Sequence, residues 1–275
     1  MNRRRNPWAF RSPLSEQATT RYTFYLPVSR HDSQSSGGLA MALTLKYQGE
    51  TSVPVEIEGL IPDKTKLSTL AELEKFPIYH GNREIELAEF FSLSGDPSDG
   101  NMIFQGDLSG VHWIGAGMSE GEIVVEGNAG RHVGSEMTGG SVLVQGDAGD
   151  WVGGEMHGGF LHVKGRAGHL IGAAYRGSRR GMTGGTLLVD GKAGNEVGHT
   201  MRRGLIAVGS AGDAVAFNMI AGSVFVFGDC GIRPAAGMRR GCVALFGDDP
   251  PALLPTFRRD CVYQPQFLRY YLLKL

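Results

Sequence analysis

Pairs of apolar residues separated by one intervening residue recur at regular intervals through the second half of the chain. This period of two predicts short β-strands with one face turned toward a core. The pairs are Ile123 and Val125, Val142 and Val144, Leu161 and Val163, Leu187 and Val189, Ile206 and Val208, Val224 and Val226, and Val243 and Leu245. A second apolar row follows the strands at Val133, Val152, Ile171, Val197 and Val215. Each repeat therefore supplies at least two inward faces, separated by a corner.

Methionines mark the period of this repeat. They stand at Met118, Met137, Met156, Met182, Met201, Met219 and Met238, which gives spacings of 19, 19, 26, 19, 18 and 19 residues. The one long spacing exceeds the usual 19 by 7 residues, and the extra residues lie around Ala173 to Gly181. A fixed period of this length is typical of a solenoid, in which each repeat forms one coil and stacks on its neighbours.

Glycine accounts for 42 of the 275 residues and falls at fixed places in the repeat. Corners such as Gly146-Asp147-Ala148-Gly149 suit glycine because it permits positive φ and a close approach of stacked coils. We therefore expect a mainly β fold, a glycine-rich β-helix of about seven coils of 19 residues.

The repeat and the segments on either side of it predict that the chain has four parts. Residues 1–40 are expected to form a flexible extension, 41–96 a small N-terminal α/β module, 97–249 the β-helix, and 250–275 a C-terminal cap or docking tail. In the module, Leu43 to Ile57 alternates like a hairpin with Gln48-Gly49 near its turn. Thr69 and Glu72 have the spacing of a capping box and predict a short helix.

Charge and cysteine content exclude several classes of protein. A net charge of −1 gives no general field for nucleic acid or an anionic membrane, so neither is expected as a partner. No apolar run is long enough to cross a membrane, no secretory signal is evident, and three cysteines without a C-x-x-C pair favour a reducing compartment. We expect a cytoplasmic protein, in which Cys230 fills a position that other coils give to alanine.

No pattern in the sequence predicts a catalytic or metal site. The histidines of the repeat occupy different offsets, so they do not form a ligand set, and no local signature of Ser-His-Asp or Cys-His chemistry is present. Pairs such as Gly127 and Gly130 recur in every coil without a following helix, which identifies them as corners and not phosphate loops.

Arginines form the one candidate binding surface. Arg202 and Arg203 follow Met201 just as Arg239 and Arg240 follow Met238, so the two pairs should lie two coils and roughly 10 Å apart. Arg176, Arg179 and Arg180 lie in the insertion before Met182. Because the guanidinium group binds carboxylates with two parallel hydrogen bonds, this arginine stripe could hold an acidic partner loop or a polyanionic coenzyme tail, or could be solvated turn charges.

The repeat M-x-G-G-x-[VIL]-x-V-x-G-x-A-G-x-x-[VI]-G resembles that of the C subunit of formylmethanofuran dehydrogenase and of its counterpart in the bacterial formyltransferase/hydrolase complex. The preceding module, with Ile57 to Asp63 and Asn82 to Phe91, strengthens this resemblance over about Met41 to Leu275. The solenoid is also similar to the glycine-rich C-terminal domain of the glutamate synthase large subunit.

This resemblance implies a right-handed parallel β-helix that organises catalytic partner subunits in tetrahydromethanopterin-linked one-carbon metabolism and carries no catalytic residue of its own. It implies metals in partner subunits, and a methanofuran-type coenzyme with an acidic tail in the complex. The expected contacts of that tail are Arg179, Arg180, Arg202, Arg203, Arg239 and Arg240.

Two other interpretations remain. The chain could be a stand-alone glutamate-synthase-type solenoid that acts as a structural spacer. A β-helix acyltransferase is the alternative among enzymes, although Ile123, Ala129 and Ser135 break the six-residue rule of that fold.

Overall fold

The computed structural model describes residues 42–262 and 266–272. The chain divides into two compact units, one of Ala40–Ala252 and one of Met1–Leu39 with Leu253–Leu275, and each is described by itself. In the second unit the described residues form one helix, α3 (Gln266–Leu272). The expected flexible extension lies outside the described residues, and the proposed cap at the C-terminus stays a prediction.

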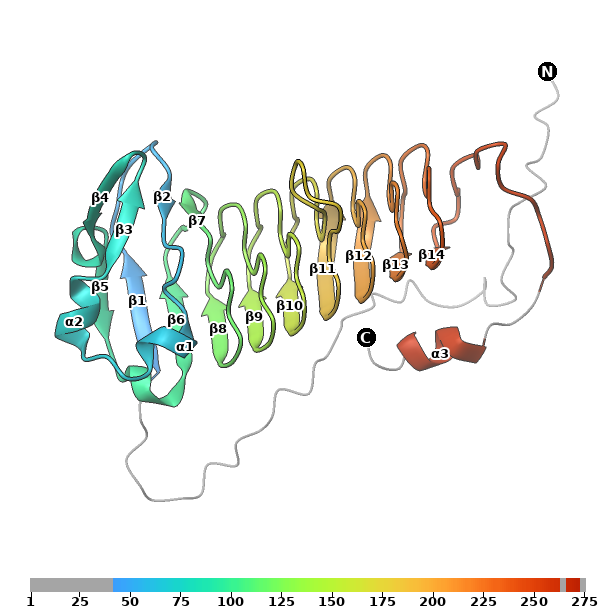
Figure 1. Ribbon diagram of the computed structural model, residues 1–275. Coiled ribbons are helices and arrows are strands. Elements are labelled where there is room, and N and C mark those ends of the chain that lie inside the picture. The colour runs from blue at the N-terminus through green and yellow to red at the C-terminus, as the bar shows by residue number, and fades with distance from the viewer. Residues whose placement is uncertain (1–41, 263–265, 273–275) are drawn as a thin grey trace, which may run out of the picture. The chain divides into compact units, whose positions relative to one another are not determined.

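The unit Ala40–Ala252 is a β-solenoid with a small module at its N-terminal end (Figure 1). Its module contains β1 (Leu43–Tyr47), β2 (Val55–Glu56), α1 (Pro62–Thr65), α2 (Leu70–Glu74), β3 (Pro77–His80), β4 (Arg83–Glu86), η1 (Leu87–Glu89), β5 (Phe91–Ser94) and η2 (Pro97–Asp99). The solenoid contains β6 (Asn101–Gln105), β7 (Val111–His112), β8 (Glu122–Val125), β9 (Ser141–Val144), β10 (Phe160–Val163), β11 (Thr186–Ala193), β12 (Leu205–Ala211), β13 (Ser223–Val226) and β14 (Cys242–Leu245).

One sheet runs along the solenoid in the order β14-β13-β12-β11-β10-β9-β8-β6-β1-β5. From β6 to β14 neighbouring strands are parallel, so each coil places its strand beside the strand of the next coil. Within the described residues this gives eight coil strands, one more than the methionines mark, because β6 precedes the first methionine of the repeat. The parallel β-helix expected from the sequence is confirmed.

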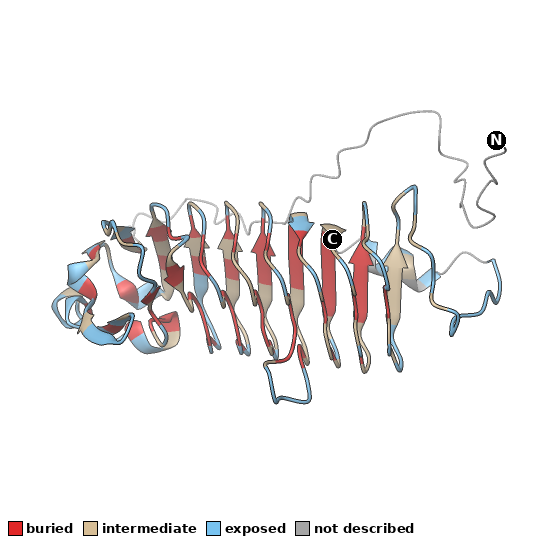
Figure 2. Ribbon diagram, turned by 90° about the horizontal axis from the view of Figure 1, so that it is seen from above, coloured by how far each residue is buried: buried red, intermediate tan, exposed pale blue. Residues whose placement is uncertain are grey.

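The inward residues of the strands stack in register and form the core. Ile123 pairs with Val142, which pairs with Leu161, and the same row continues to Val224. These side chains have no exposed surface, and Figure 2 shows buried positions along the strands from one coil to the next. A single coil could not bury such a face, so the stacking of coils creates the core.

Methionine and glycine positions of adjacent coils fit each other. A β-carbon added at Gly204 would lie 2.9 Å from the terminal methyl of Met182, and one added at Gly222 would lie 2.9 Å from that of Met201. The same contact recurs at Gly140, Gly159, Gly185 and Gly241, each against the methionine of the preceding coil. The methionine methyl therefore occupies the space that the missing glycine side chain leaves, which explains why both residues recur with one period.

The expected hairpin over Leu43 to Ile57 is wrong. β1 pairs with β5 and β6 in the long sheet, whereas β2 pairs with β3 and β7 in a separate four-stranded sheet. Each strand therefore extends a different row of the solenoid and buries its apolar face there, which no local turn signal reports. The helix α2 has the expected capping box between Thr69 and Glu72.

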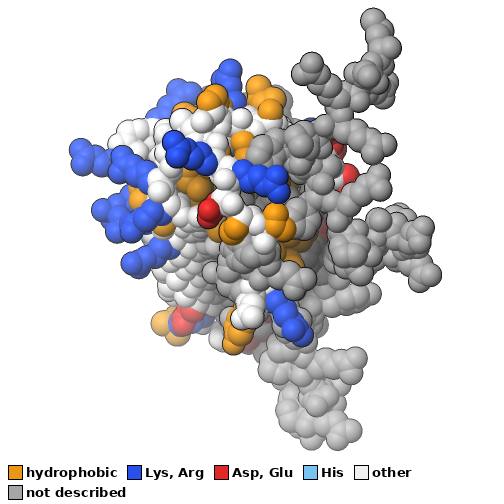
Figure 3. All heavy atoms as spheres, turned by 90° about the vertical axis from the view of Figure 1, so that its right-hand side faces the viewer, with side chains coloured by type: hydrophobic (Ala, Val, Ile, Leu, Met, Phe, Trp, Pro, Cys, Tyr) orange, Lys and Arg blue, Asp and Glu red, His pale blue; other side chains and the backbone are white. Residues whose placement is uncertain are grey.

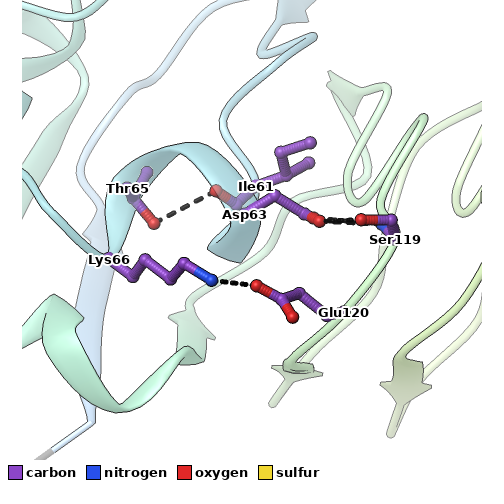
Figure 4. A network of polar contacts seen from close by, with 6 residues as sticks. All are labelled: Ile61, Asp63, Thr65, Lys66, Ser119 and Glu120. Carbon is purple, nitrogen blue, oxygen red and sulfur yellow. Dashed lines mark hydrogen bonds and ion pairs between the residues drawn. The ribbon is translucent and has the colours of Figure 1, made fainter.

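Helix α1 connects the module to the first corner of the solenoid (Figure 4). The Asp63 carboxylate accepts hydrogen bonds from the backbone N–H of Ser119, at 3.0 Å, and from its hydroxyl, while Lys66 forms an ion pair with Glu120. Partial burial would raise the pKa of Asp63, but the hydrogen bonds from Ser119 and from the nearby backbone together outweigh it and lower the pKa.

We expect Asp63→Ala to cost about 1–2 kcal/mol of unfolding free energy, because the N–H and hydroxyl of Ser119 lose a charged acceptor. Lys66→Ala should cost less than Asp63→Ala, because an exposed ion pair contributes little. Urea unfolding of both variants would measure the difference. Equal losses would contradict this assignment of the contact.

Candidate functional site: two arginine-lined cavities

The residue that follows each methionine occupies one corner of the solenoid, and the coils bring these residues into a row. Its N–H donates to the carbonyl of the preceding coil's methionine, as Arg202 does to Met182 at 2.8 Å and Arg239 to Met219 at 2.9 Å. The row runs through His157, Thr183, Arg202, Ile220 and Arg239. The structure thus places Arg202 and Arg239 two coils apart on one side of the solenoid, as the spacing predicts.

The insertion between the third and fourth methionines of the repeat leaves the solenoid at this corner. The chain departs after Gly172 and returns at Met182, whose N–H donates to the Gly172 carbonyl at 2.9 Å. The insertion therefore closes on itself, and the strands before and after it, β10 and β11, pair in regular parallel register. Arg176, Arg179 and Arg180 lie on it and are exposed.

Two cavities flank the insertion. The first has a volume of about 710 Å³ and the second about 590 Å³. The first is lined by Glu155, His157, Ser178, Arg179, Arg180, Thr183, Arg202 and Arg203. The second is lined by Arg179, Arg180, Thr200, Asn218, Ile220, Gly237 and Arg239. Arg179 and Arg180 belong to both, whereas Arg240 and Arg176 line neither.

The cavities carry a strong excess of positive charge. Glu155 is the one carboxylate in either lining. Among the described residues, none of the lining arginines has a carboxylate partner within ion-pair distance. Figure 3, which views the molecule from the β14 end, shows Lys and Arg side chains gathered on one side. Unpaired guanidinium groups around a cavity favour an anionic ligand, above all one with carboxylates or phosphates.

An aromatic ladder lies on a neighbouring corner, and the sequence analysis missed it. The ring of His132 stacks on that of Trp113 with centroids 4.0 Å apart and planes 5° apart, and it faces Trp151 at 6.1 Å. Tyr175, from the insertion, packs on Trp151 at 4.9 Å. The signal was available, because Trp113, His132 and Trp151 are separated by 19 residues each.

The ladder holds His132 in its neutral form. Burial, reinforced by the positive potential of His112 and Arg131, lowers the pKa of His132 to about 4, although Asp150 acts in the opposite direction. A neutral imidazole can accept a hydrogen bond at one nitrogen, and Nδ1 of His132 lies 3.2 Å from the Tyr175 hydroxyl. Burial also raises the pKa of Tyr175 to about 12, so its hydroxyl keeps its proton.

Acid should destabilise the fold through His132. The unfolded chain binds a proton near the ordinary pKa of about 6.5, whereas the folded chain does so only near 4. The contribution of neutral His132 to the free energy of unfolding is therefore fully present above the unfolded pKa. It is lost as the pH decreases from about 6.5 toward about 4. We expect His132→Phe, which keeps a stacked ring, to lose less stability than the wild type between about pH 7 and pH 5 in urea unfolding. An equal loss would exclude His132 as the titrating group.

The described residues show no other cluster suited to chemistry. No group of three or more His, Cys, Asp or Glu side chains that could hold a metal ion occurs among them. Cys230 pairs with Ala211 of the adjacent coil, as its place in the repeat predicts. Burial raises the pKa of the Cys230 thiol to about 11. No helix of the described part is both long enough and apolar enough to cross a membrane.

Comparisons with known proteins show what this chain is similar to. No family model matches the chain. It is 37% identical over 95 residues to the C subunit of the tungsten-containing formylmethanofuran dehydrogenase 2 of Methanothermobacter wolfeii, a match that covers 33% of this chain and 34% of that protein. It is also 37% identical over 91 residues to the C subunit of the molybdenum-containing formylmethanofuran dehydrogenase 1 of Methanothermobacter thermautotrophicus, covering 33% and 23%. The chain thus spans about a third or less of the length of these curated relatives.

A solved structure matches most of the chain. It is the formyltransferase/hydrolase complex of Methylorubrum extorquens with methylofuran, one chain of which aligns with a TM-score of 0.78 and 33% identity, over 83% of this chain and 85% of that chain. This agreement in sequence and fold over most of both chains confirms the resemblance that the repeat indicates. The chain belongs to the family formed by the C subunit of formylmethanofuran dehydrogenase and its counterpart in the formyltransferase/hydrolase complex.

Proposed function

We propose that this chain is a non-catalytic β-helix subunit that organises the catalytic subunits of a formyl-transferring enzyme complex. The observation that carries the proposal is the match to a chain of the formyltransferase/hydrolase complex over 83% of the sequence. A rigid solenoid suits this role, because stacked coils present a long surface whose parts keep fixed positions. The partners are transferase and hydrolase subunits, or dehydrogenase subunits, and they supply the metals.

The formyltransferase/hydrolase complex is the better supported of the two assemblies. Similarity to its chain extends over most of this sequence, whereas similarity to the dehydrogenase subunits extends over 33%. The complex of Methylorubrum extorquens was solved with methylofuran. We include a coenzyme of this type, and a cytoplasmic location with its reducing conditions, in the proposal.

The arginine-lined cavities are the proposed contact of this subunit with an acidic element, either the coenzyme tail or an acidic segment of a partner. Arg179, Arg180, Arg202 and Arg203 line the first cavity and have no ion-pair partner in the described part of the chain. A bound carboxylate would receive charge-assisted hydrogen bonds from them, and these are about twice as strong as neutral ones.

Replacing Arg202, Arg203, Arg239 and Arg240 with serine should weaken the retention of an acidic coenzyme or partner by about tenfold or more, because each charge-assisted bond contributes roughly 1.5–3 kcal/mol. The measurement is assembly and formyl-transfer activity of the purified complex. A matched control replaces four exposed cations elsewhere, Lys46, Lys75, Arg83 and Lys192. Unchanged assembly and activity in the arginine variant would exclude the arginine stripe as a functional contact.

A further inference from the structure

A row of carboxylates runs beside the aromatic ladder. Glu136 and Glu155 each follow a ring of the ladder by four residues, at the same place in two successive coils. The N–H of Glu136 donates to the carbonyl of Gly154 at 2.8 Å, so the two glutamates stand on neighbouring coils about 4.8 Å apart. Like charges at this spacing repel each other and cost stability unless a cation lies beside them. The row therefore favours a cationic ligand.

A third carboxylate comes from the N-terminal module. Strand β2 pairs with β7, and the N–H of Ile57 donates to the carbonyl of His112 at 3.2 Å. Glu58 and Trp113 are the next residues along these two segments, so the pairing brings Glu58 to the first ring of the ladder. Burial is the main cause of the raised pKa of Tyr175, and the negative potential of Glu58 and of the two glutamates of the row adds to it. All three carboxylates therefore lie near one end of the ladder.

The surface among these groups is open at Gly117. This glycine occupies on the first coil the place that Glu136 holds on the next, and its N–H donates to the carbonyl of Ser135 at 2.8 Å. No atom lies within 4 Å of a β-carbon added at Gly117. Glu58 and Glu136 are exposed, and Trp113 is half-buried. This opening is called the acidic corner below, and its residues are Glu58, Trp113, Gly117 and Glu136.

The carboxylates of the acidic corner have no cation of their own. Oε1 of Glu155 accepts the N–H of Tyr175 at 2.8 Å, and Glu155 also lines the first cavity together with arginines. Glu58 and Glu136 have no such neighbours, and neither forms an ion pair within the described part of the chain. These two carboxylates are therefore left for a ligand.

Two nearby cations do not fill the acidic corner. Arg131, which lies near the ladder, is 3.7 Å from the carboxylate of Asp150 and is thereby paired. The ammonium group of Lys64 lies 3.2 Å from a β-carbon added at Gly59, but Lys64 and Glu58 form no ion pair. The charge that complements the acidic corner must come from another molecule.

We propose that the acidic corner binds an arginine side chain of a catalytic partner subunit. The proposal rests on the subunit role proposed above and names one contact of that role. A planar guanidinium stacks on an indole ring and donates two parallel hydrogen bonds to a carboxylate, whereas an ammonium group is compact and more strongly hydrated. The corner offers one such ring, Trp113, beside the carboxylates of Glu58 and Glu136.

The acidic corner and the arginine-lined cavities attract opposite charges. A partner segment that meets the corner is basic, whereas an element that enters the cavities is acidic. Opposite requirements at two places on one rigid solenoid fix the orientation of what binds there, because a reversed partner would bring like charges together. Arginine is also among the residues that contribute most to protein interfaces.

The first test uses the full chain and a glycyl-arginyl-glycine peptide with blocked ends, and follows binding by tryptophan fluorescence. The chain has three tryptophans, so Trp8→Phe leaves only the two of the ladder as reporters. We expect a saturable change, with binding several times tighter than that of the matching lysine peptide. Glu58→Gln and Glu136→Gln should each weaken binding of the arginine peptide about tenfold.

The matched controls are Glu50→Gln and Glu74→Gln, at exposed glutamates of the N-terminal module, and both should leave binding unchanged. No saturable binding of the arginine peptide, or equal binding by Glu136→Gln and the wild type, would overturn the cation site. Equal affinities for the arginine and lysine peptides would overturn its preference for a guanidinium group.

Gly117→Asn tests the opening itself. Asparagine tolerates the left-handed backbone that Gly117 adopts at a φ of 70°, and its β-carbon would contact no other atom. The variant should therefore unfold at the temperature of the wild type. Its side chain would occupy the opening, so binding of the arginine peptide should fall about tenfold. Unchanged binding would show that the ligand does not lie at Gly117 and would overturn the acidic corner.

The second test uses the purified complex. With the photocrosslinker p-benzoylphenylalanine in place of Glu136, irradiation should join this chain to a partner peptide that contains arginine, whereas the same group in place of Glu74 should not. The double variant Glu58→Gln and Glu136→Gln should release that partner at lower salt than the wild type. Partners that copurify but show neither effect would overturn this docking contact and leave the subunit role intact. If no partner copurifies, the subunit role fails instead, and the docking contact fails with it.

Discussion

Replacing Gly158 with alanine is expected to destabilise the solenoid by about 3 kcal/mol, since an added methyl group has no room between the coils. The β-carbon would overlap the carbonyl oxygen of Thr138 in the preceding coil and would lie 3.0 Å from the carbonyl carbon of the same residue. The neighbour is backbone held by the stacking of coils, so relief requires the two coils to move apart. Thermal and urea unfolding would measure the loss.

Gly110→Ala is the matched control, because no atom lies within 4 Å of its added β-carbon and its φ is not in the left-handed region. This variant should stay within about 0.5 kcal/mol of the wild type. If both variants were equally stable, close stacking at Gly158 would not be a determinant of the fold.

Truncating Met201 to alanine is the second change with a large expected effect, about 2–5 kcal/mol. The side chain is fully buried, and its terminal methyl fills the space beside Gly222 of the next coil. Truncation leaves a cavity there that the stacked backbone cannot close. Met201→Leu, which nearly conserves volume, should cost less than about 1.5 kcal/mol.

The pairing of methionine with glycine can be tested by a double-mutant cycle. Gly222→Ala alone introduces a clash with the Met201 methyl and also a side chain at a φ of 116°. Removing the methyl by Met201→Ala relieves the clash, so the double variant should be more stable than the sum of the two losses predicts. Strict additivity in urea unfolding would contradict the packing of the methyl against this glycine.

The solenoid was predictable because its signals repeat. One strand such as Val142 to Val144 is ambiguous on its own, but the same alternation after Met118, Met137 and Met156 leaves few other folds. The strand of the first coil, β6, was not among the seven predicted coils because it precedes the first methionine of the repeat. The hairpin was wrong for the opposite reason, since β1 and β2 find their partners in segments far along the chain.

The site was predictable in part. Arg202 and Arg239 each follow a methionine of the repeat directly, so the period alone predicted that they lie on one side of the solenoid. The place of Arg179 and Arg180 between two cavities was not predictable, since it depends on how the insertion folds. That fold is set by contacts of Tyr175 with side chains from other coils, which no local pattern reports.

Affinity purification of this chain from its native cell tests whether it organises a formyl-transferring complex. We predict that formyltransferase and hydrolase subunits copurify, with activity on formyl-tetrahydromethanopterin and no molybdenum or tungsten. A metal-pterin subunit in the purified material would instead identify the dehydrogenase. Recovery of the chain alone, without catalytic partners, would contradict this organising role.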